Sequence, residues 1–497
     1  MARRLPGGLV TFGIDTMVAL IELVAPGGTA DLAKPAERMM ALGGCFVGGL
    51  VFAVALLALL DRVPDAMRRR VAAAAGVVLA VVVALLSSGV NEAYDAIVLP
   101  ALWIAVLAVA WTVGLEIVYR RLAAPAATPA AAAPAGPSAA SVTPLDRRRF
   151  LVRVGGASAA ITVVGAGLAL TRRGGSAGPA LDETWSATHP LPNADDPITP
   201  VAGTRPELTP LEDHYRIDIN TSSPRVDEAE WRLRIDGLVE NPVTLTLGEL
   251  RVRYRPLHQF VTLACISNRI GGPLTSTTRW TGVPLRDVLQ EAGLRDEATH
   301  VVIRSADDFH ETVARELVEA DERVMLTYAW DGIPLLRKHG FPLRLYIPDR
   351  YGMKQPKWIT RLEAVDEWQP GYWVQRNWDR EARMRATAVI DSVATDMMIA
   401  EAGADTLVPV GGIAHAGARG ISHVEVRVDD GPWVEAGLRT PLADTTWVVW
   451  RYDWPFREGR HTFTVRCVDG NGVEQIPIEQ PMRPSGATGL HSTDVML

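Results

Sequence analysis

Long runs of apolar residues without charge fill much of the first third of the chain. Each run approaches the ~20 residues that an α-helix needs to cross ~30 Å of hydrocarbon. Four of them predict membrane-spanning helices, at about 39–60, 71–90, 97–119 and 151–170. A fifth run, 8–25, carries Asp15 and Glu22, which are costly in a bilayer unless they face other helices. We therefore expect a bundle of about five transmembrane helices.

The arginines between these runs predict how the helices are oriented. Arginines cluster in the loop 61–70 and again in 120–149, whereas 87–96 contains no Lys or Arg. Short loops rich in Lys and Arg face the cytoplasm. The helix at 151–170 should then leave the membrane on the outer side. Everything after about residue 172 is expected to be extracytoplasmic.

The segments around the last predicted helix have distinct compositions. The expected divisions are a helical region 1–121, a linker 122–149 rich in Ala and Pro, an anchor helix 150–172 and an extracytoplasmic tether 173–204. The linker ends in Asp146-Arg147-Arg148-Arg149-Phe150-Leu151, which resembles a twin-arginine export signal. The same arginines also fit a simple positively charged flank of the anchor helix. No histidine precedes His189, so these helices lack the paired imidazoles of a membrane b-type haem.

Composition narrows the remaining possibilities. A chain of 497 residues predicts roughly three domains. A net charge of -7 gives no reason to expect nucleic acid as a partner. The three cysteines, Cys45, Cys265 and Cys467, are an odd number without a C-x-x-C pair, which argues against a disulfide framework or a cysteine-built zinc site. Cys45 and Cys467 lie in apolar or alternating stretches typical of structural positions.

Short strand-like runs and short helices alternate over residues 205–385, which is typical of an α+β domain. Cys265 closes one apolar run there, and Ser267, Asn268 and the glycine pair 271–272 follow it. A lone cysteine at such a place is more often a core residue. However, a strand end that passes into a glycine loop can present a side chain to a cofactor.

Six sequence blocks keep a fixed order in this region. They are Tyr215-Arg216; Leu263-Ala264-Cys265-Ile266-Ser267-Asn268-Arg269; Trp280-Thr281-Gly282-Val283-Pro284-Leu285; Tyr328 with Asp331-Gly332-Ile333-Pro334-Leu335; His339-Gly340-Phe341-Pro342-Leu343-Arg344; and Tyr351-Gly352-Met353-Lys354-Gln355-Pro356-Lys357-Trp358. Together they resemble the molybdenum domain of the sulfite oxidase family. The order of the whole set is far more specific than any single block.

This resemblance implies a Mo-molybdopterin cofactor. In the family, two pterin dithiolene sulfurs and one cysteine sulfur bind molybdenum, and the matching cysteine here is Cys265; a soft thiolate suits such a redox metal. Arg344 and Lys357 match positions that suit the pterin phosphate. The other positions that match cofactor contacts are Tyr215, Arg216, Ser305, His339, Gln355 and Pro356.

The expected substrate is a small sulfur oxyanion that takes part in oxygen-atom transfer. Sulfite oxidases place an arginine five residues after the ligand cysteine, where this chain has Ile270. Arg216, Arg269 and Tyr328 then remain as candidates to bind an anion. The family also contains exported enzymes that reduce S-oxides, so a sulfoxide or N-oxide reductase is an alternative. A membrane-tethered binding module without cofactor and a membrane transporter are competing hypotheses.

Alternating apolar runs return after residue 386, at 423–428, 447–452 and 461–468, separated by turn residues. This spacing predicts an antiparallel β-sandwich over 386–497. It resembles the immunoglobulin-like dimerisation domain that follows the molybdenum domain in sulfite oxidases, so a homodimer is the family expectation. The chain has no C-x-x-C-H haem motif and no cysteine cluster. We therefore expect an external electron carrier, either a cytochrome or a quinone-linked protein.

Overall fold

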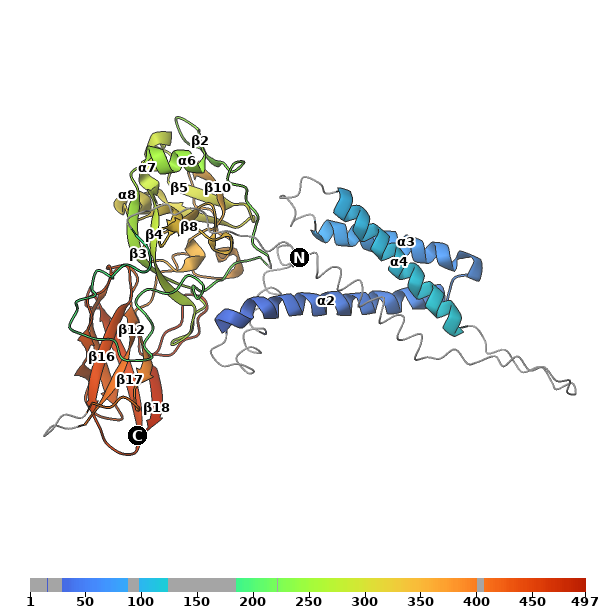
Figure 1. Ribbon diagram of the computed structural model, residues 1–497. Coiled ribbons are helices and arrows are strands. Elements are labelled where there is room, and N and C mark those ends of the chain that lie inside the picture. Colours follow the sequence, from blue (N-terminus) through green and yellow to red (C-terminus); the bar gives the residue numbers. More distant parts are fainter. Residues whose placement is uncertain (1–15, 17–28, 88–97, 124–184, 221, 400–405) are drawn as a thin grey trace, which may run out of the picture. The chain divides into compact units, whose positions relative to one another are not determined.

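Three of the N-terminal apolar runs form helices in the computed structural model of the protein (Figure 1), which describes residues 16, 29–87, 98–123, 185–220, 222–399 and 406–497. The helices are α2 (Thr29–Leu60), α3 (Asp65–Ser87) and α4 (Val98–Ala123). Within the described part, Gly43–Leu60 of α2 is the one stretch long and apolar enough to cross a membrane. The predicted spans 8–25 and 151–170 and most of the linker lie outside the described residues, so the five-helix bundle stays a prediction.

Helices α3 and α4 approach each other closely at a glycine. A Cβ atom built on Gly76 would lie 2.7 Å from the Val109 Cα atom and 2.5 Å from Thr112 Oγ1. The Thr112 hydroxyl donates to the carbonyl of Ala108 one turn back, at 3.0 Å. Small residues that let two backbones come together are typical of helix contacts inside membranes. The helix contact thus requires glycine at position 76.

The middle of the chain builds two β-sheets, one mixed and one antiparallel. The first sheet has the strand order β2-β1-β10-β5-β6. In this sheet β1 runs parallel to β10, and all other neighbouring strands are antiparallel. The second has the order β3-β4-β7-β8, with β9 on β7, and all of its pairs are antiparallel. The strands are β1 (Leu233–Gly237), β2 (Val243–Leu245), β3 (Leu257–Ala264), β4 (Thr275–Pro284), β5 (His300–Ser305), β6 (His310–Ala314), β7 (Met325–Trp330), β8 (Ile333–Pro334), β9 (Arg344–Tyr346) and β10 (Ile359–Val365).

Short helices cover the apolar core between these strands. They are α6 (Leu247–Arg253), α7 (Leu285–Ala292) and α8 (Arg315–Ala320). A capping box starts α6, because the Thr246 hydroxyl accepts from the Glu249 amide while the Glu249 carboxylate accepts from the Thr246 amide. Gly293, at φ 66°, ends α7 in the left-handed conformation that glycine tolerates best.

The C-terminal region consists of two four-stranded antiparallel sheets that share one apolar core. Their orders are β11-β12-β16-β15 and β14-β13-β17-β18, drawn in orange to red in Figure 1. Alternating residues such as Val424, Val426, Phe463 and Val465 fill the core, and Cys467 is one of them. The strands are β11 (Thr387–Val393), β12 (Leu407–His415), β13 (Ile421–Val428), β14 (Val434–Glu435), β15 (Gly437–Leu438), β16 (Val448–Pro455), β17 (Arg460–Asp469) and β18 (His491–Met496).

The C-terminal domain is also hydrogen-bonded to strand β3. The Thr262 amide donates to the Thr445 carbonyl at 3.0 Å, and the Trp447 amide donates to the Thr262 hydroxyl at 2.8 Å. The segment expected to be a tether packs on this domain as well, because Arg439 donates to the carbonyls of Asn193 and Ile198 at 2.6 and 2.8 Å. The described end of the tether, residues 185–204, is therefore part of the folded unit.

Candidate cofactor site

Cys265 follows the last residue of β3 and is buried. Its amide donates to the Leu274 carbonyl at 2.9 Å, and its Sγ atom lies 3.0 Å from the Ser267 hydroxyl. Burial raises the pKa of the thiol, whereas the hydrogen bonds from Ser267 and the charge of Lys357 act in the opposite direction. A thiol in this setting needs a strong cation, such as a metal ion, to become a thiolate ligand.

A tight loop after Cys265 fixes the position of the thiol. The Asn268 amide donates to the Cys265 carbonyl at 3.0 Å, and the Asn268 side chain accepts from the Leu274 amide at 2.9 Å. Gly271 has φ 76°, a conformation that few side chains adopt. The glycine pair in the sequence thus closes the loop that presents Cys265.

Three cations gather near this thiol: Arg344, which is buried, and Arg216 and Lys357, which are partly buried. The Asp218 carboxylate pairs with two of them, at 2.8 Å from Arg216 Nε and 3.4 Å from Lys357 Nζ. Arg344 is 3% exposed, stacks its guanidinium 4.5 Å from the ring centre of Trp280 and donates to the His339 carbonyl at 3.0 Å. Arg344 has no carboxylate partner among the described residues. The cluster therefore carries an excess of positive charge in a buried place.

Several side chains of this cluster have buried polar atoms without a hydrogen-bond partner in the described part of the chain. These atoms are His214 Nε2, Arg216 Nη2, Trp330 Nε1, His339 Nε2 and Arg344 Nε; the predicted cofactor contact Ser305, at the end of β5, also has a buried hydroxyl of this kind. An unpaired buried polar group costs ~1–3 kcal/mol, so such groups rarely stand together without a reason. A polar ligand that reaches all of them would remove this cost.

Aromatic rings form one wall of the cluster. The Trp330 and His339 rings lie 4.6 Å apart between centres, and His214 lies 4.9 Å from Trp330 and 5.2 Å from His339. Burial lowers the pKa of His214 to about 3 and also lowers that of His339. Both imidazoles are therefore neutral at physiological pH and can each donate and accept one hydrogen bond.

Burial also disfavours the charged forms of Lys357 and Arg344. It lowers the pKa of Lys357 to about 8 and that of Arg344 to about 10, with Asp218 opposing the shift at Lys357. Desolvation disfavours a charged group until an opposite charge arrives. A phosphate at this place would supply that charge, so the electrostatics of the site fit an anionic ligand.

The segment between β9 and β10 completes the cluster. It contains the 3₁₀ turn Gly352–Lys354, and the Gln355 side chain is held by the Arg350 and Ile347 carbonyls at 2.8 and 3.3 Å. The Pro356 carbonyl accepts from the Leu345 amide at 2.9 Å. A Cβ atom on Gly340, which follows the turn Arg337–His339, would lie 3.1 Å from the Lys357 side chain. Gly340 also has φ 116°, a conformation that other residues rarely adopt, so glycine is favoured at this position.

The structure separates three of the predicted anion-pocket positions from this cluster. Tyr328 is buried in the core that contains α6 and α7, with the Arg251 guanidinium 5.5 Å from its ring centre. Arg269 is exposed on the loop after Cys265. Ile270 packs against the C-terminal residues Val389, Ile413, Trp447 and Val449, so its side chain is directed to that domain. Of the predicted anion ligands, Arg216 is the one that lies in the cluster.

Sequence reasoning missed two members of the site, His214 and Trp330. His214 directly precedes the Tyr215-Arg216 block, and Trp330 directly precedes the Asp331-Gly332 turn. Because each of them adjoins a block that resembles the cofactor-binding family, the sequence did indicate that they lie near the cofactor site. The stacking that joins them to His339 depends on tertiary structure and has no sequence pattern.

Comparisons with known proteins agree with this chemistry. Residues 220–373 match the family described as oxidoreductase molybdopterin binding domain. A nitrate reductase [NAD(P)H] from Hordeum vulgare is 26% identical over 357 residues, covering 58% of this chain and 40% of that protein. A sulfite oxidase from Gallus gallus is 28% identical over 284 residues, covering 48% of this chain and 61% of that protein. The chain thus spans less than two thirds of either relative.

A solved structure shares the fold. The crystal structure of the sulfane dehydrogenase SoxCD from Paracoccus pantotrophus matches with a TM-score of 0.51 and 22% identity, covering 58% of this chain and 81% of that chain. The family match shows that the chain contains a molybdopterin-binding oxidoreductase domain, at residues 220–373. Members of the matched domain family carry Mo-molybdopterin, and the relatives that this part of the chain resembles include sulfite oxidase and nitrate reductase. The three cations and the buried polar atoms without a partner among the described residues fit that cofactor.

Proposed function

We propose that the chain is a membrane-anchored extracytoplasmic enzyme that transfers an oxygen atom to or from a small sulfur oxyanion. The observation that carries this proposal is the cluster of buried, incompletely paired cationic and polar groups next to Cys265. When bound, the cofactor supplies a redox metal that can exchange an oxygen atom and two electrons. The protein supplies binding, orientation and electrostatics.

Each residue of the cluster has a proposed part in holding the cofactor. Cys265 is the protein sulfur ligand of molybdenum. Arg344 and Lys357 bind the phosphate, since a guanidinium can form two parallel hydrogen bonds and an ammonium adds a point charge. His214, Ser305, Trp330 and His339 hydrogen-bond the polar edges of the pterin. Residues 355–357 and Tyr215 hold its other side.

Arg216 is proposed to contact both the cofactor region and the substrate. Its Nε atom is fixed by Asp218, and its Nη2 atom is buried without a partner among the described residues. A guanidinium fixed on one edge presents its other edge in a defined direction. This direction would orient an oxyanion for the reaction.

A reductase of neutral sulfoxides or N-oxides is the second candidate. It is favoured by the packing of Ile270 against the C-terminal domain and by the exposure of Arg269, with Arg216 as the predicted cation that lies in the cluster. A substrate without charge needs fewer cations. The two candidates therefore differ in how much they depend on Arg216.

Anchoring and export remain proposals that rest on the sequence. The uncharged apolar runs, the arginines in 61–70 and 120–149 and the motif at 146–151 support an enzyme fixed to the membrane with its catalytic part outside. An external cytochrome or quinone-linked protein would exchange electrons with it. A homodimer through the immunoglobulin-like C-terminal domain is proposed from the family resemblance.

The test combines metal analysis with paired assays. We expect about one molybdenum per chain from a host that makes the cofactor, because one thiolate and one cluster are present. Sulfite oxidation and sulfoxide reduction are then measured in the wild type and in Arg216→Met. Loss of one charge-assisted contact should weaken binding of an anion roughly ten- to a hundredfold. If sulfoxide alone is turned over and the variant leaves its Michaelis constant unchanged, the reductase replaces the first candidate.

A further inference from the structure

The ends of three helices meet at the arginine-rich turn between α2 and α3. Arg68, near the start of α3, donates from its Nε atom to the carbonyls of Leu60 and Val63 at 2.9 and 3.0 Å. Its guanidinium also lies 5.5 Å from the centre of the Tyr119 ring, which belongs to α4. The Tyr119 hydroxyl donates to the Asp61 carboxylate. These contacts fix the turn and hold the start of α3 against the end of α4.

The acidic side chains at this end of the helices are either paired or buried. Asp65 pairs with Arg68 Nη1 at 2.6 Å, and Asp61 accepts the hydrogen bond from Tyr119. Glu116 lies one turn before Tyr119 and is 2% exposed. Among the described residues, no exposed carboxylate is therefore left here to neutralise a further cation.

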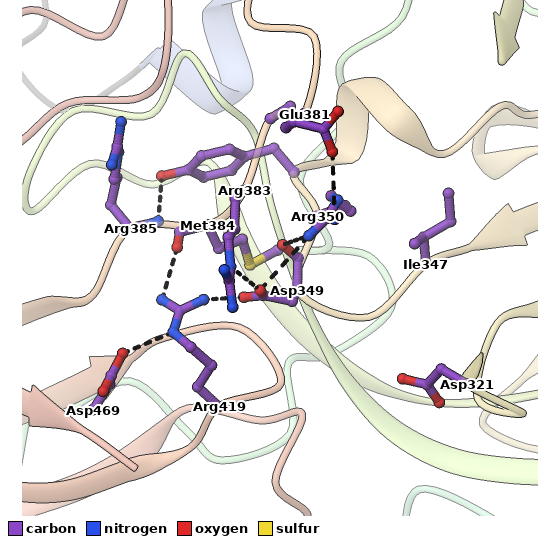
Figure 2. Close-up of polar contacts among 12 residues, drawn as sticks. Asp321, Ile347, Asp349, Arg350, Glu381, Arg383, Met384, Arg385, Arg419 and Asp469 are labelled. Carbon is purple, nitrogen blue, oxygen red and sulfur yellow. Dashed lines mark hydrogen bonds and ion pairs between the residues drawn. The ribbon is translucent and has the colours of Figure 1, made fainter. Parts of the chain in front are cut away.

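Three arginines of the same turn are exposed. Arg62 follows the end of α2, and Arg69 and Arg70 belong to the first two turns of α3. None of the three forms an ion pair with another described residue. By contrast, the exposed Arg383 of the catalytic region pairs with Asp349 at 2.6 Å (Figure 2). The turn therefore carries an excess of positive charge on a backbone that is held in place.

An apolar stripe on α3 leads away from these arginines. It consists of Val77, Val78 and Val81, which are exposed. They follow Arg70 by seven, eight and eleven residues, so the helix places all four side chains on one face. At about 1.5 Å per residue, the stripe ends about 16 Å along the helix from Arg70. This length is close to half of the ~30 Å of hydrocarbon in a bilayer, which is the depth of one lipid leaflet.

An anionic phospholipid matches both the charge and the length of this surface. Its phosphate lies at the membrane surface, and its acyl chains extend through one leaflet. A guanidinium can form two parallel hydrogen bonds with phosphate oxygens. Arginines that flank a membrane helix attract anionic lipids. A zwitterionic lipid such as phosphatidylcholine carries a cation of its own, so arginines bind it less well.

We propose that Arg62, Arg69 and Arg70 bind the phosphate of an anionic phospholipid whose acyl chain lies along the valine stripe of α3. The proposal rests on the proposed membrane anchoring, because a lipid reaches the stripe only if α3 spans the bilayer. It involves no residue of the cofactor cluster. The bound lipid neutralises the arginine turn and fixes the depth of α3 in the leaflet that the turn faces. In the proposed orientation this is the cytoplasmic leaflet.

The experiment is electron paramagnetic resonance on the full-length chain in phosphatidylcholine vesicles that contain a trace of spin-labelled lipid. The association constant of labelled phosphatidylglycerol is divided by that of labelled phosphatidylcholine. One arginine near an anionic headgroup strengthens binding roughly fivefold, so the wild type should prefer phosphatidylglycerol at least about tenfold at low salt. Arg69→Gln combined with Arg70→Gln should bring the ratio close to unity, whereas Arg70→Lys should keep most of the preference. The matched control Arg383→Gln, at a paired arginine outside the helices, should keep the wild-type ratio.

Equal association of the two labelled lipids with the wild type would overturn the proposal, and so would a ratio that the double variant leaves unchanged. Sodium phosphate that displaces labelled phosphatidylglycerol, while sodium chloride at matched ionic strength does not, would assign the arginines to a free phosphate instead of a lipid. Flotation of the same sample separates this proposal from the anchoring proposal. A chain that does not float with the vesicles refutes the anchoring, whereas a chain that floats and binds both lipids equally refutes the lipid site alone.

Discussion

The buried ion pair of Glu311 and Lys354 offers a sharp test of the fold around the cofactor segment. Lys354 Nζ lies 2.6 Å from Glu311 Oε1, and the two side chains are 7% and 0% exposed. The Thr312 amide donates to the same oxygen at 2.8 Å. Lys354 ends the turn before Gln355 and Lys357, while Glu311 belongs to β6, so the pair fastens the cofactor segment to the first sheet.

Removing the lysine should be strongly destabilising. In Lys354→Met, Glu311 keeps its burial but loses the ammonium that compensates it, and breaking a buried pair in this way costs ~3–5 kcal/mol. This is a large part of the ~5–15 kcal/mol by which domains are typically stable. The double variant Glu311→Gln with Lys354→Met removes the uncompensated charge and should recover most of the loss.

The loss should also depend on pH in a defined direction. Burial raises the pKa of Glu311, and Lys354 is the main group that lowers it. A carboxyl group whose pKa is higher in the folded than in the unfolded chain costs stability only above its unfolded pKa, 4.5 here. The destabilisation by Lys354→Met should therefore be largest near neutral pH and shrink as the pH falls toward that value.

Urea unfolding followed by tryptophan fluorescence measures these free energies in the wild type, both single variants and the double variant. The experiment should be run near neutral pH and again at moderately acidic pH. A destabilisation below ~1 kcal/mol in Lys354→Met at neutral pH, or a double variant no more stable than that single variant, would refute the reasoning.

Three further predictions address other parts of the chain. Cys265→Ser should leave the protein folded but nearly inactive, because a hydroxyl is a harder donor than a thiolate; near-normal turnover would remove Cys265 from its role. Burial raises the pKa of Asp331 to about 6 from 3.8, so the wild type loses stability as the pH rises through this window, and Asp331→Asn should be more stable by up to ~3 kcal/mol above it. Urea unfolding across this range measures the difference, and a constant gap would contradict the argument. A reporter fused after Leu497 should be active only if it works outside the cytoplasm; cytoplasmic activity would overturn the proposed orientation.

Parts of the fold could be predicted because local pattern and burial agree. The strands at 423–428 and 461–468 bury alternate residues such as Val424 and Val426, so their alternation was visible. One face of each of these strands is buried and the other is more exposed. Apolar and polar residues then alternate along the sequence, and this alternation predicts a strand. The strand end at Cys265 was visible because an apolar run passes into a glycine loop, whereas its role as a metal ligand rests on the family resemblance and stays a prediction.

Tyr328 illustrates why other positions could not be placed. Every residue of β7, Met325–Trp330, is buried, so the strand has no polar face and no alternation. The sequence therefore could not tell that Tyr328 points into the α6 and α7 core while Trp330 points to the cofactor cluster. The sequence likewise could not predict that the Ile270 side chain packs against the C-terminal domain, because its contacts are with residues more than a hundred positions away.

The pairing of β3 with the C-terminal domain affects when the site can be completed during synthesis. Strand β3 lies at the edge of its sheet, and residues 445–447 cover that edge through hydrogen bonds across 185 positions, including those of Thr262 with Trp447 and of Phe260 with Thr445. At ~5–20 residues per second a ribosome needs roughly ten to forty seconds to reach them. During that interval the strand that ends at Cys265 has an open edge. Cofactor insertion into a finished site must therefore wait until nearly the whole chain has emerged.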